Sequence, residues 1–500
     1  MAEKASGTDP GTRVIVVGAG PVGLMLAGEL RLGGAGVVVL ERLPEPTGES
    51  RASQLNSRTM EVLDQRGLVE ALGGTEPTGR GHFGGLALDA SRLPGRYPGY
   101  WKIPQFRTEA TLRTWASGLG ADIRAGREVR ALAAGDDGVE VTADGPGGPL
   151  RVSGSYLVGC DGADSTVRRL AGIGMRGTAA SRELLRADVA GLEIPDRRFE
   201  RFENGLAIAA RRGDGVTRVM LHEFGRTAAR RSGPPDFAEV VSGWARITGE
   251  DISSGTPIWV DAFDDASLQA TRYREGRVLL AGDSAHVQLP AGGQALNLGL
   301  QDAANLGWKL AAQACGRAPA GLLDTYHDER HPVGEQVLAN VRAQAHLLLG
   351  GPEVEPVRAV MREMLALPEC NDRLAATVGG LDVRYEDGGH GLVGGRMPHC
   401  DLVTGSEHTS TTRLLHPAKG VLVDLSGEDA SPGGPGSPQA IAAHWGDRVR
   451  VVPAKTGSDG PLRGLGAVLL RPDGHVAWTT PDGGDLRAAL SRWFGPPATT

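Results

Sequence analysis

The chain has 500 residues and a formal net charge of −7, with 53 Lys and Arg residues interspersed among 60 Asp and Glu residues. This length implies two or three domains with ample core, and the mixed acidic charge excludes an extended nucleic-acid-binding surface. No apolar run approaches the roughly 20 residues of a membrane-spanning helix, and residues 1–12 are polar without an apolar signal core. We therefore expect a cytoplasmic protein without a membrane partner, with a disordered segment at 1–12.

The first motif follows a short β-branched run. Residues 14–17 lead into Gly18, Gly20 and Gly23 in a Gly-x-Gly-x-x-Gly pattern, and a second apolar run ends in Glu41. In a β-α-β unit these glycines permit a tight turn, close approach of a pyrophosphate, and close helix–strand packing. The helix start offers free N–H groups to phosphates, and Glu41 is placed to accept hydrogen bonds from a ribose. The pattern predicts a dinucleotide site, with a plain glycine turn as the alternative.

The next segments carry weaker signals. Arg51 lies in a loop just past this unit, where a cation can face a cofactor or remain solvated. A helix is expected from residue 57 onward, with Ser57 or Thr59 as its cap, and another over 108–119 with Thr108 as its cap. Residues 73–104, rich in Gly, Pro and aromatic side chains, fit the lining of a flat substrate's pocket or simple packing under a loop.

A second glycine–acid turn follows the apolar run 156–159. It reads Asp161-Gly162, and a helix is expected to begin at Asp164 or Ser165. This arrangement resembles a second phosphate-facing helix start, but Asp-Gly is also common in capped turns.

A third such turn follows the apolar run 278–281. Gly282-Asp283 places a carboxylate where it can bind a polyol such as a ribityl chain, and the glycine-rich loop from Pro290 leads into a helix start at 293–297. Its bare N–H groups suit the region of a flavin where negative charge develops on reduction. His286 is either catalytic or, by preference, a structural donor.

Two further regions have a different character. Residues 180–270 contain alternating strand-like segments at 184–189, 206–210 and 216–223, which predict an antiparallel sheet. Beyond a Gly- and Pro-rich boundary near 390, strands at 420–425, 449–452, 467–470 and 476–478 and a helix at 486–493 predict a small α/β module. Its single cysteine, Cys400, excludes dithiol chemistry, and the four scattered cysteines show no metal-ligand spacing.

Together the three turns, in this order, resemble the FAD-dependent aromatic hydroxylases, or group A flavoprotein monooxygenases. Within that group, the segments 47–51, 58–67, 81–85 and 104–105 are similar to hydroxylases that tailor angucycline-type aromatic polyketides. The resemblance implies an α/β fold with a Rossmann-like FAD-binding domain (13–179 and 271–389). It further implies an inserted antiparallel substrate-binding sheet (180–270) and a thioredoxin-like C-terminal domain (390–500).

The resemblance also implies a site. The pyrophosphate would lie at the first turn and Asp161, the adenosine ribose at Glu41 and Arg42, and the ribityl chain at Asp283. Arg51 is implied beside the reacting centre, as the one catalytic side chain. The full set implied to bind FAD is Gly18, Gly20, Pro21, Val22, Gly23, Glu41, Arg42, Arg51, Gln105, Val129, Asp161, Gly162, Asp283, Pro290, Gly293, Gln294, Ala295, Leu296 and Asn297.

The implied reaction uses FAD, NADPH and O2. NADPH reduces the flavin, O2 forms a C4a-hydroperoxide, and an aromatic carbon of a polycyclic polyketide takes the distal oxygen in antibiotic biosynthesis. Baeyer–Villiger insertion into a related polyketide and non-catalytic flavin or polyketide binding are the alternatives. A flavin halogenase is disfavoured because Gly99 stands where its Trp-x-Trp-x-Ile-Pro motif needs the first Trp. Similar proteins are commonly homodimers.

Overall fold

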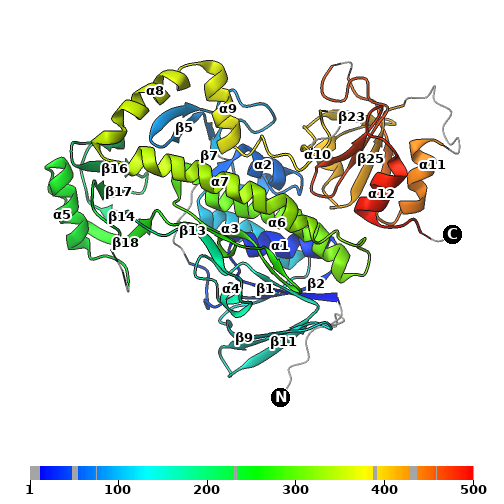
Figure 1. Cartoon of the computed structure of the whole chain (residues 1–500), viewed down its shortest axis with the longest axis horizontal. Coiled ribbons are helices and arrows are strands. Elements are labelled where there is room, and N and C mark those ends of the chain that lie inside the picture. Colours follow the sequence, from blue (N-terminus) through cyan, green and yellow to red (C-terminus); the bar gives the residue numbers. More distant parts are fainter. Residues whose placement is uncertain are drawn as a thin grey trace.

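The structure is a computed structural model that describes residues 12–47, 54–74, 76–229, 231, 233–386, 391–426, 436–457 and 459–498. Arg51 and the N-terminal residues 1–11 lie outside the described residues. Figure 1 shows a central α/β body, with a sheet covered by α5 at one end and a smaller domain, coloured orange and red, at the other.

A six-stranded sheet forms the centre of the fold. Its order is β20-β21-β12-β1-β2-β8, and every neighbouring pair is parallel except β20 and β21. The apolar runs predicted as strands are buried along β12, β2 and β21, as expected for a parallel sheet covered on both faces. The bounds are β1 Arg13–Val17, β2 Gly36–Leu40, β8 Asp122–Arg124, β12 Tyr156–Gly159, β20 Arg274–Glu275 and β21 Val278–Leu280.

Helix α1 (Pro21–Leu32) packs against α3 (Gln105–Gly118) and α6 (Gln294–Ala314). Close approach depends on glycine, because a Cβ on Gly307 of α6 would lie 2.2 Å from the Cβ of Glu29 on α1. The predicted start of α3 at Thr108 was wrong: the helix begins directly after Pro104, and Thr108 is buried within it. The predicted caps of α2 (Ser57–Asp64) were also wrong, since the Asn56 side chain accepts a hydrogen bond from the Thr59 N–H.

The second large sheet is antiparallel, with the order β15-β16-β17-β14-β18. Successive side chains of a strand point to opposite faces. Leu185 and Ala187 of β14 pack with Trp244 of α5 (Phe237–Thr248), whereas Leu184 packs with Val341 of α7. The bounds are β14 Glu183–Ala190, β15 Arg197–Arg201, β16 Gly205–Arg211, β17 Val216–Glu223, β18 Thr256–Asp264 and α7 Thr325–Leu349.

The C-terminal strands form a sheet in the order β26-β25-β27-β28, with β25 and β26 parallel and the other pairs antiparallel. This is the strand order of a thioredoxin-like fold, as the resemblance implied. All four cysteines of the chain are free thiols. The bounds are β25 Gly420–Asp424, β26 Val449–Pro453, β27 Ala467–Leu470, β28 Val476–Thr479, α11 Pro438–Ala442 and α12 Leu486–Phe494.

A buried charge cluster joins this domain to α7 and α6. Glu329 of α7 accepts hydrogen bonds from Arg471 (2.5 and 2.9 Å), Lys309 (2.7 Å) and Asn305 (2.6 Å). Arg471 also pairs with Asp473 in the turn between β27 and β28. The two cations lower the pKa of Glu329 to about 2, although burial opposes them. The domains are therefore connected by specific ionic contacts as well as by apolar packing.

Candidate active site

The three predicted turns meet at one edge of the six-stranded sheet. Val17 at the end of β1 lies opposite both Leu40 of β2 and Gly159 of β12, and Gly159 lies opposite Leu280 of β21. The carboxyl ends of these parallel strands are thus in register. Ligands of open α/β sheets bind beyond such ends, so this edge is the candidate cofactor site.

The first turn has the geometry expected of a dinucleotide site. Gly18 has φ +104°, and a Cβ there would lie 2.3 Å from the Cys160 carbonyl oxygen. A Cβ on Gly23 would lie 2.0 Å from the Gly18 oxygen, whereas a Cβ on Gly20 would meet no atom within 4 Å. Gly18 and Gly23 are therefore required by packing, and Gly20 faces open space. Because α1 begins without a side-chain cap, its first N–H groups are available for an anion, so the turn fits FAD.

Glu41 is held beside this turn. Its two carboxylate oxygens accept hydrogen bonds from the Ala19 and Leu43 N–H groups at 2.7 and 2.8 Å. The neighbouring Arg42 is exposed. These contacts fix the orientation of the carboxylate at the end of β2, where an adenosine ribose would lie.

Two further residues predicted to contact FAD, Gln105 near the flavin and Val129 near the adenine, lie on other elements. Gln105 begins α3 and donates to Glu109 at 2.8 Å. Burial raises the pKa of Glu109, and the charge of Glu41 adds to the effect. Val129 is buried in β9 (Glu128–Ala134). Gln105 is thus hydrogen-bonded to Glu109 within α3, and the contacts of Gln105 and Val129 with FAD stay predictions.

At the second turn, the Asp161 carboxylate stabilises the start of α4 (Thr166–Leu170). It accepts hydrogen bonds from the Ser165 hydroxyl (2.5 Å) and the Val167 N–H (3.0 Å), and Ser165 is the cap residue. These are the contacts of the capped-turn alternative. Gly162 has φ +83° and leaves open space beside its Cα. A contact of Asp161 with pyrophosphate stays a prediction.

The third turn contacts the first directly. Gly282 has φ +67°, and a Cβ there would lie 2.9 Å from Cγ2 of Val22, while Asp283 is exposed. His286 is fully buried and pairs with Asp302 (2.8 Å), which also accepts from the Gly282 N–H (3.2 Å) and from Arg330 (2.8 Å). This geometry matches the structural-donor interpretation of His286, because its imidazole supports the turn through Asp302.

The start of α6 is held in place by Asn297. Its amide oxygen accepts from the Asn56 N–H (3.0 Å), and its amide nitrogen donates to the Gln54 and Gly293 carbonyls (3.1 and 2.6 Å). Gly292 and Gly293 both have φ +66°. The loop from Pro290 therefore presents backbone rather than side chain before α6, which is the shape predicted to face the edge of an isoalloxazine.

A cavity of about 290 Å³ opens between this loop and the inner face of the antiparallel sheet. Residues of the α6 start and of the antiparallel sheet both line this cavity. The predicted contact with the flavin edge and the predicted substrate-binding sheet therefore face the same cavity. Its described lining residues are Gln54, His82, Lys102, Leu184, Arg186, Phe199, Ile208, Arg218, Met220, Phe263, Leu289, Pro290, Ala291, Gly293, Ala295, Leu296 and Leu348. Cavities of this kind, apolar with a few polar groups, are typical ligand sites.

One wall of the cavity is aromatic. The rings of His82 and Phe199 lie 4.1 Å apart, and Phe199 has φ +54°, a left-handed conformation that costs of order 1–3 kcal/mol for a bulky residue. Burial lowers the pKa of His82 to about 4, with Arg198 and Lys102 contributing, so the ring is neutral at pH 7. The conformation falls at an irregularity in the pairing of β15 with β16, and the Phe199 ring lines the cavity beside His82.

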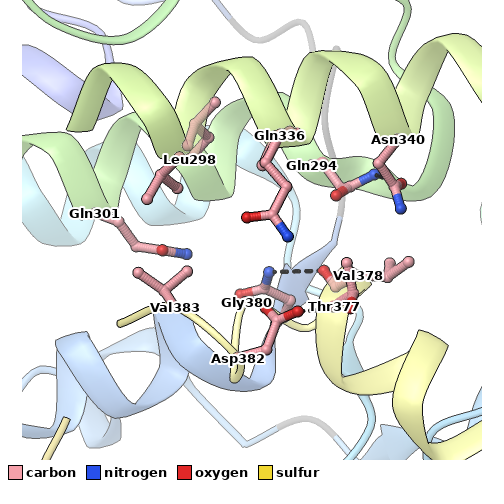
Figure 2. A pocket seen from close by; sticks show the side chains of 13 residues that line it. Gln294, Leu298, Gln301, Gln336, Asn340, Thr377, Val378, Gly380, Asp382 and Val383 are labelled. Carbon is pink, nitrogen blue, oxygen red and sulfur yellow. Dashed lines mark hydrogen bonds between the residues drawn. The ribbon is translucent and has the colours of Figure 1, made fainter. Parts of the chain in front are cut away.

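A second cavity lies behind the α6 start and is much smaller. Figure 2 shows the amide side chains of Gln294, Gln301, Gln336 and Asn340 around it, and its volume is about 30 Å³. Gln294 donates to Asn340 at 3.0 Å. This space suits a water molecule and is too small for a flavin or an aromatic substrate. We therefore interpret this small cavity as part of the packing of α6 against α7, and not as a ligand site.

Several cavity residues were missed from the sequence. His82 was among the aromatic residues of the stretch 73–104 that were predicted to line the pocket of a flat substrate, and it does line the cavity, whereas Lys102 of the same stretch was given no role of its own. Arg186 was detectable in principle, because it occupies the inward position next to Leu184 on a predicted strand. Phe199 carries no signal in its local pattern. Within the described residues there is no cluster of His, Cys, Asp and Glu suited to a metal ion.

Comparisons with known proteins agree with this geometry. The FAD binding domain family matches residues 11–341, and the aromatic-ring hydroxylase C-terminal family matches residues 390–497. A solved structure of CabE, an aromatic hydroxylase from angucycline biosynthesis, is 52% identical with a TM-score of 0.93, covering 97% of this chain and 99% of that one. Across the described part of the chain, no helix is both long enough and apolar enough to cross a bilayer.

Two curated relatives indicate how far functions diverge at this level of similarity. The 12-dehydrotetracycline 5-monooxygenase/anhydrotetracycline 6-monooxygenase of Streptomyces rimosus is 43% identical over 97% of this chain and 99% of its own length. The dialkyldecalin synthase of Streptomyces rugosporus is 40% identical over the same shares.

Proposed function

Because the chain belongs to the aromatic-ring hydroxylase family of FAD-dependent monooxygenases, we propose that it hydroxylates a polycyclic aromatic polyketide of the angucycline type, with NADPH as reductant. The observation that carries the proposal is the shared cavity, in which the backbone of the α6 start faces the inner face of the antiparallel sheet. A homodimer in the cytoplasm and the domain limits given above are part of the same proposal.

Bound FAD, reduced by NADPH, would supply the activation of O2, and the net reaction adds one oxygen atom to the substrate while the other leaves as water. The residues of the chain itself bind and orient FAD and the substrate. The N–H groups at the start of α1 would hold the pyrophosphate, Glu41 the ribose, and Asp283 the ribityl chain. The N–H groups at the start of α6 would stabilise negative charge at the edge of the flavin ring.

On the substrate side, the inner face of the sheet excludes water. Leu184, Ile208, Met220 and Phe263 line that face, and Phe199 offers a flat surface for stacking. Arg51 is proposed as the polar group beside the reacting carbon. Arg51→Ala should keep the fold while disturbing the position of the flavin or lowering the ratio of product formed to NADPH oxidised.

The test supplies the purified, FAD-loaded protein with NADPH, labelled O2 and a tetracyclic angucyclinone. We expect substrate-dependent NADPH oxidation and a product that carries one labelled oxygen as a hydroxyl group. A labelled lactone would instead identify Baeyer–Villiger insertion. Bound FAD without oxygen consumption would refute the oxygenase assignment, and the dialkyldecalin synthase relative makes that outcome worth measuring.

A further inference from the structure

Helix α8 (Glu355–Leu365) carries a row of exposed apolar side chains. Figure 1 shows the helix, in yellow, at the outer edge of the molecule and away from the C-terminal domain. Among the described residues, eight large apolar side chains are exposed, and half of them lie on α8 or directly after it. These four are Val357 (56%), Val360 (57%), Met364 (47%) and Leu367 (54%). Single exposed apolar residues are ordinary, whereas a contiguous group of them marks an interaction site.

The spacing of the four side chains places them on one face of the helix. Positions i, i+3, i+7 and i+10 fall in a single row, with the period of a coiled-coil seam. Leu367 follows the last helical residue, but its N–H still donates to the Met364 carbonyl at 3.0 Å, so the last turn carries it. Ala359 and Ala366, which are also exposed, widen the apolar surface on one side of the row.

The opposite face of α8 is packed, so the helix is a fixed part of the fold. Met361 and Leu365 join an apolar cluster with strand β6 (Leu86–Asp89). Arg358, which is 4% exposed, donates to the Leu347 carbonyl of α7 at 2.6 Å. The apolar row is therefore presented to solvent by a helix that is anchored on its other side.

The area of the row is enough for a small interface. Four side chains that are each about half exposed present about 350 Å², within the range of about 300–600 Å² of the largest patch on a typical monomer. Two such rows bury about 700 Å² together, and flanking residues bring the total to about 1,000–1,200 Å², the lower limit of a specific interface. This area suits a weak, reversible association.

The order of the row fits a second copy of the same chain. Its intervals of three, four and three residues read the same in both directions. Two antiparallel copies of α8 related by a two-fold axis would therefore bury all four side chains, with Val357 facing Leu367 of the partner subunit and Val360 facing Met364 of the partner subunit. A contact in which the same patch meets itself is the commonest kind in homodimers.

The charges of α8 disfavour a lipid surface or an acidic partner. The helix carries Glu355 and Glu363 against Arg358 and Arg362, so these charges cancel. Glu355 already accepts a hydrogen bond from Arg201 at 2.6 Å. Anionic membranes and acidic proteins are bound by clusters of basic residues, whereas a row that pairs with itself needs none. Exposed Glu363, beside the row, can remain in water at the rim of the contact.

We propose that α8 forms the contact between two copies of this chain, paired antiparallel about a two-fold axis near Arg362. The inference rests on the homodimer included in the proposed function and assigns the surface that forms it.

Sedimentation velocity of the FAD-loaded protein tests this surface. We expect reversible dimerisation with a dissociation constant of about 1–50 µM. Met364→Glu should raise that constant at least about thirtyfold, because the dimer would bury an unpaired carboxylate. Ile258→Glu, the same kind of change at an exposed apolar residue of β18, is the matched control and should dimerise like the unaltered protein. FAD content and circular dichroism confirm that each variant is folded and loaded.

Cross-linking tests the antiparallel arrangement. Val357→Cys and Leu367→Cys are made in separate proteins, mixed, and treated with a short bismaleimide. The two sites face each other in the proposed dimer, whereas two copies of either site lie about 15 Å apart along the helix, since ten residues at about 1.5 Å each separate them. The mixture should therefore cross-link, and neither variant alone should. The unaltered protein, with its four free cysteines, gives the background.

A dimer that survives Met364→Glu, or cross-linking of either cysteine variant alone, would overturn this surface and leave the homodimer standing. A protein that stays monomeric at about 100 µM would overturn both. Binding to phosphatidylglycerol vesicles that Met364→Glu abolishes would assign the row to a lipid surface and also overturn the proposal. The labelled-oxygen assay decides the oxygenase function separately, so the two failures are distinguishable.

Discussion

Replacement of Glu329 by Gln tests how strongly the C-terminal domain is joined to the rest of the chain. Glu329 is 8% exposed and accepts four hydrogen bonds, two of them from Arg471. Its pKa falls from an ordinary 4.5 to about 2, because Arg471 and Lys309 outweigh the opposing effect of burial. A shift of this size corresponds to about 3 kcal/mol of stability near pH 7.

The assay is urea unfolding followed by tryptophan fluorescence, since Trp308 and Trp493 both lie against Arg471. We expect Glu329→Gln to lower the free energy of the transition that these tryptophans report by about 3 kcal/mol. Glu335→Gln makes the same change at an exposed position of α7 and should stay within about 0.5 kcal/mol of the unaltered protein.

The lowered pKa of Glu329 also determines how its contribution to stability changes with pH. Because the pKa of Glu329 is lowered in the folded chain, its contribution is complete above the unfolded value of 4.5 and is lost as the pH falls from 4.5 toward about 2. The difference between the unaltered protein and Glu329→Gln should therefore narrow at about pH 3.5. Equal stability at pH 7, or a difference independent of pH, would refute the electrostatic account.

Three further substitutions test the cofactor site. Gly20→Ala should fold normally, because the added Cβ meets no protein atom within 4 Å, but it should bind FAD about tenfold more weakly. The control is Gly135→Ala, where an added Cβ also meets no atom within 4 Å. Isothermal titration with FAD compares the two variants. Asp283→Ala should be purified without FAD, and stoichiometric flavin in that variant would show that its carboxylate does not bind the ribityl chain. Asn297→Ala removes three hydrogen bonds at the α6 start, and we expect a flavin absorbance spectrum altered in position or resolution. An unchanged spectrum would count against a flavin-facing α6 start.

The strand ends at the cofactor edge were predictable because they depend on local pattern. Apolar runs that end in glycine predicted β1, β12 and β21, and the C-terminal strands were located to within about two residues in the same way. The start of α3 was missed because Thr108 has the chemistry of a cap, whereas Pro104 fixes the backbone just before the helix.

The substrate cavity was much harder to predict. Its cations come from the loop before α3 and from two strands of the inserted sheet, and they meet only because that sheet packs over the α6 start. The left-handed backbone of Phe199 lies at an irregularity in the pairing of β15 with β16, between Arg197 and Glu200, which the local pattern does not predict. Position in the chain alone does not reveal either feature.

Glu329 and Arg330 are adjacent on α7 but belong to different partners. Glu329 pairs with Arg471 of the C-terminal domain, while Arg330 pairs with Asp302, which holds His286 and the Gly282 turn. Chimaeras that exchange C-terminal domains between relatives must consequently carry the Arg471 and Asp473 turn with them. Without that turn, the transplant would leave Glu329 with Lys309 as its remaining countercharge, one residue from Arg330 and the contacts that support the Gly282 turn.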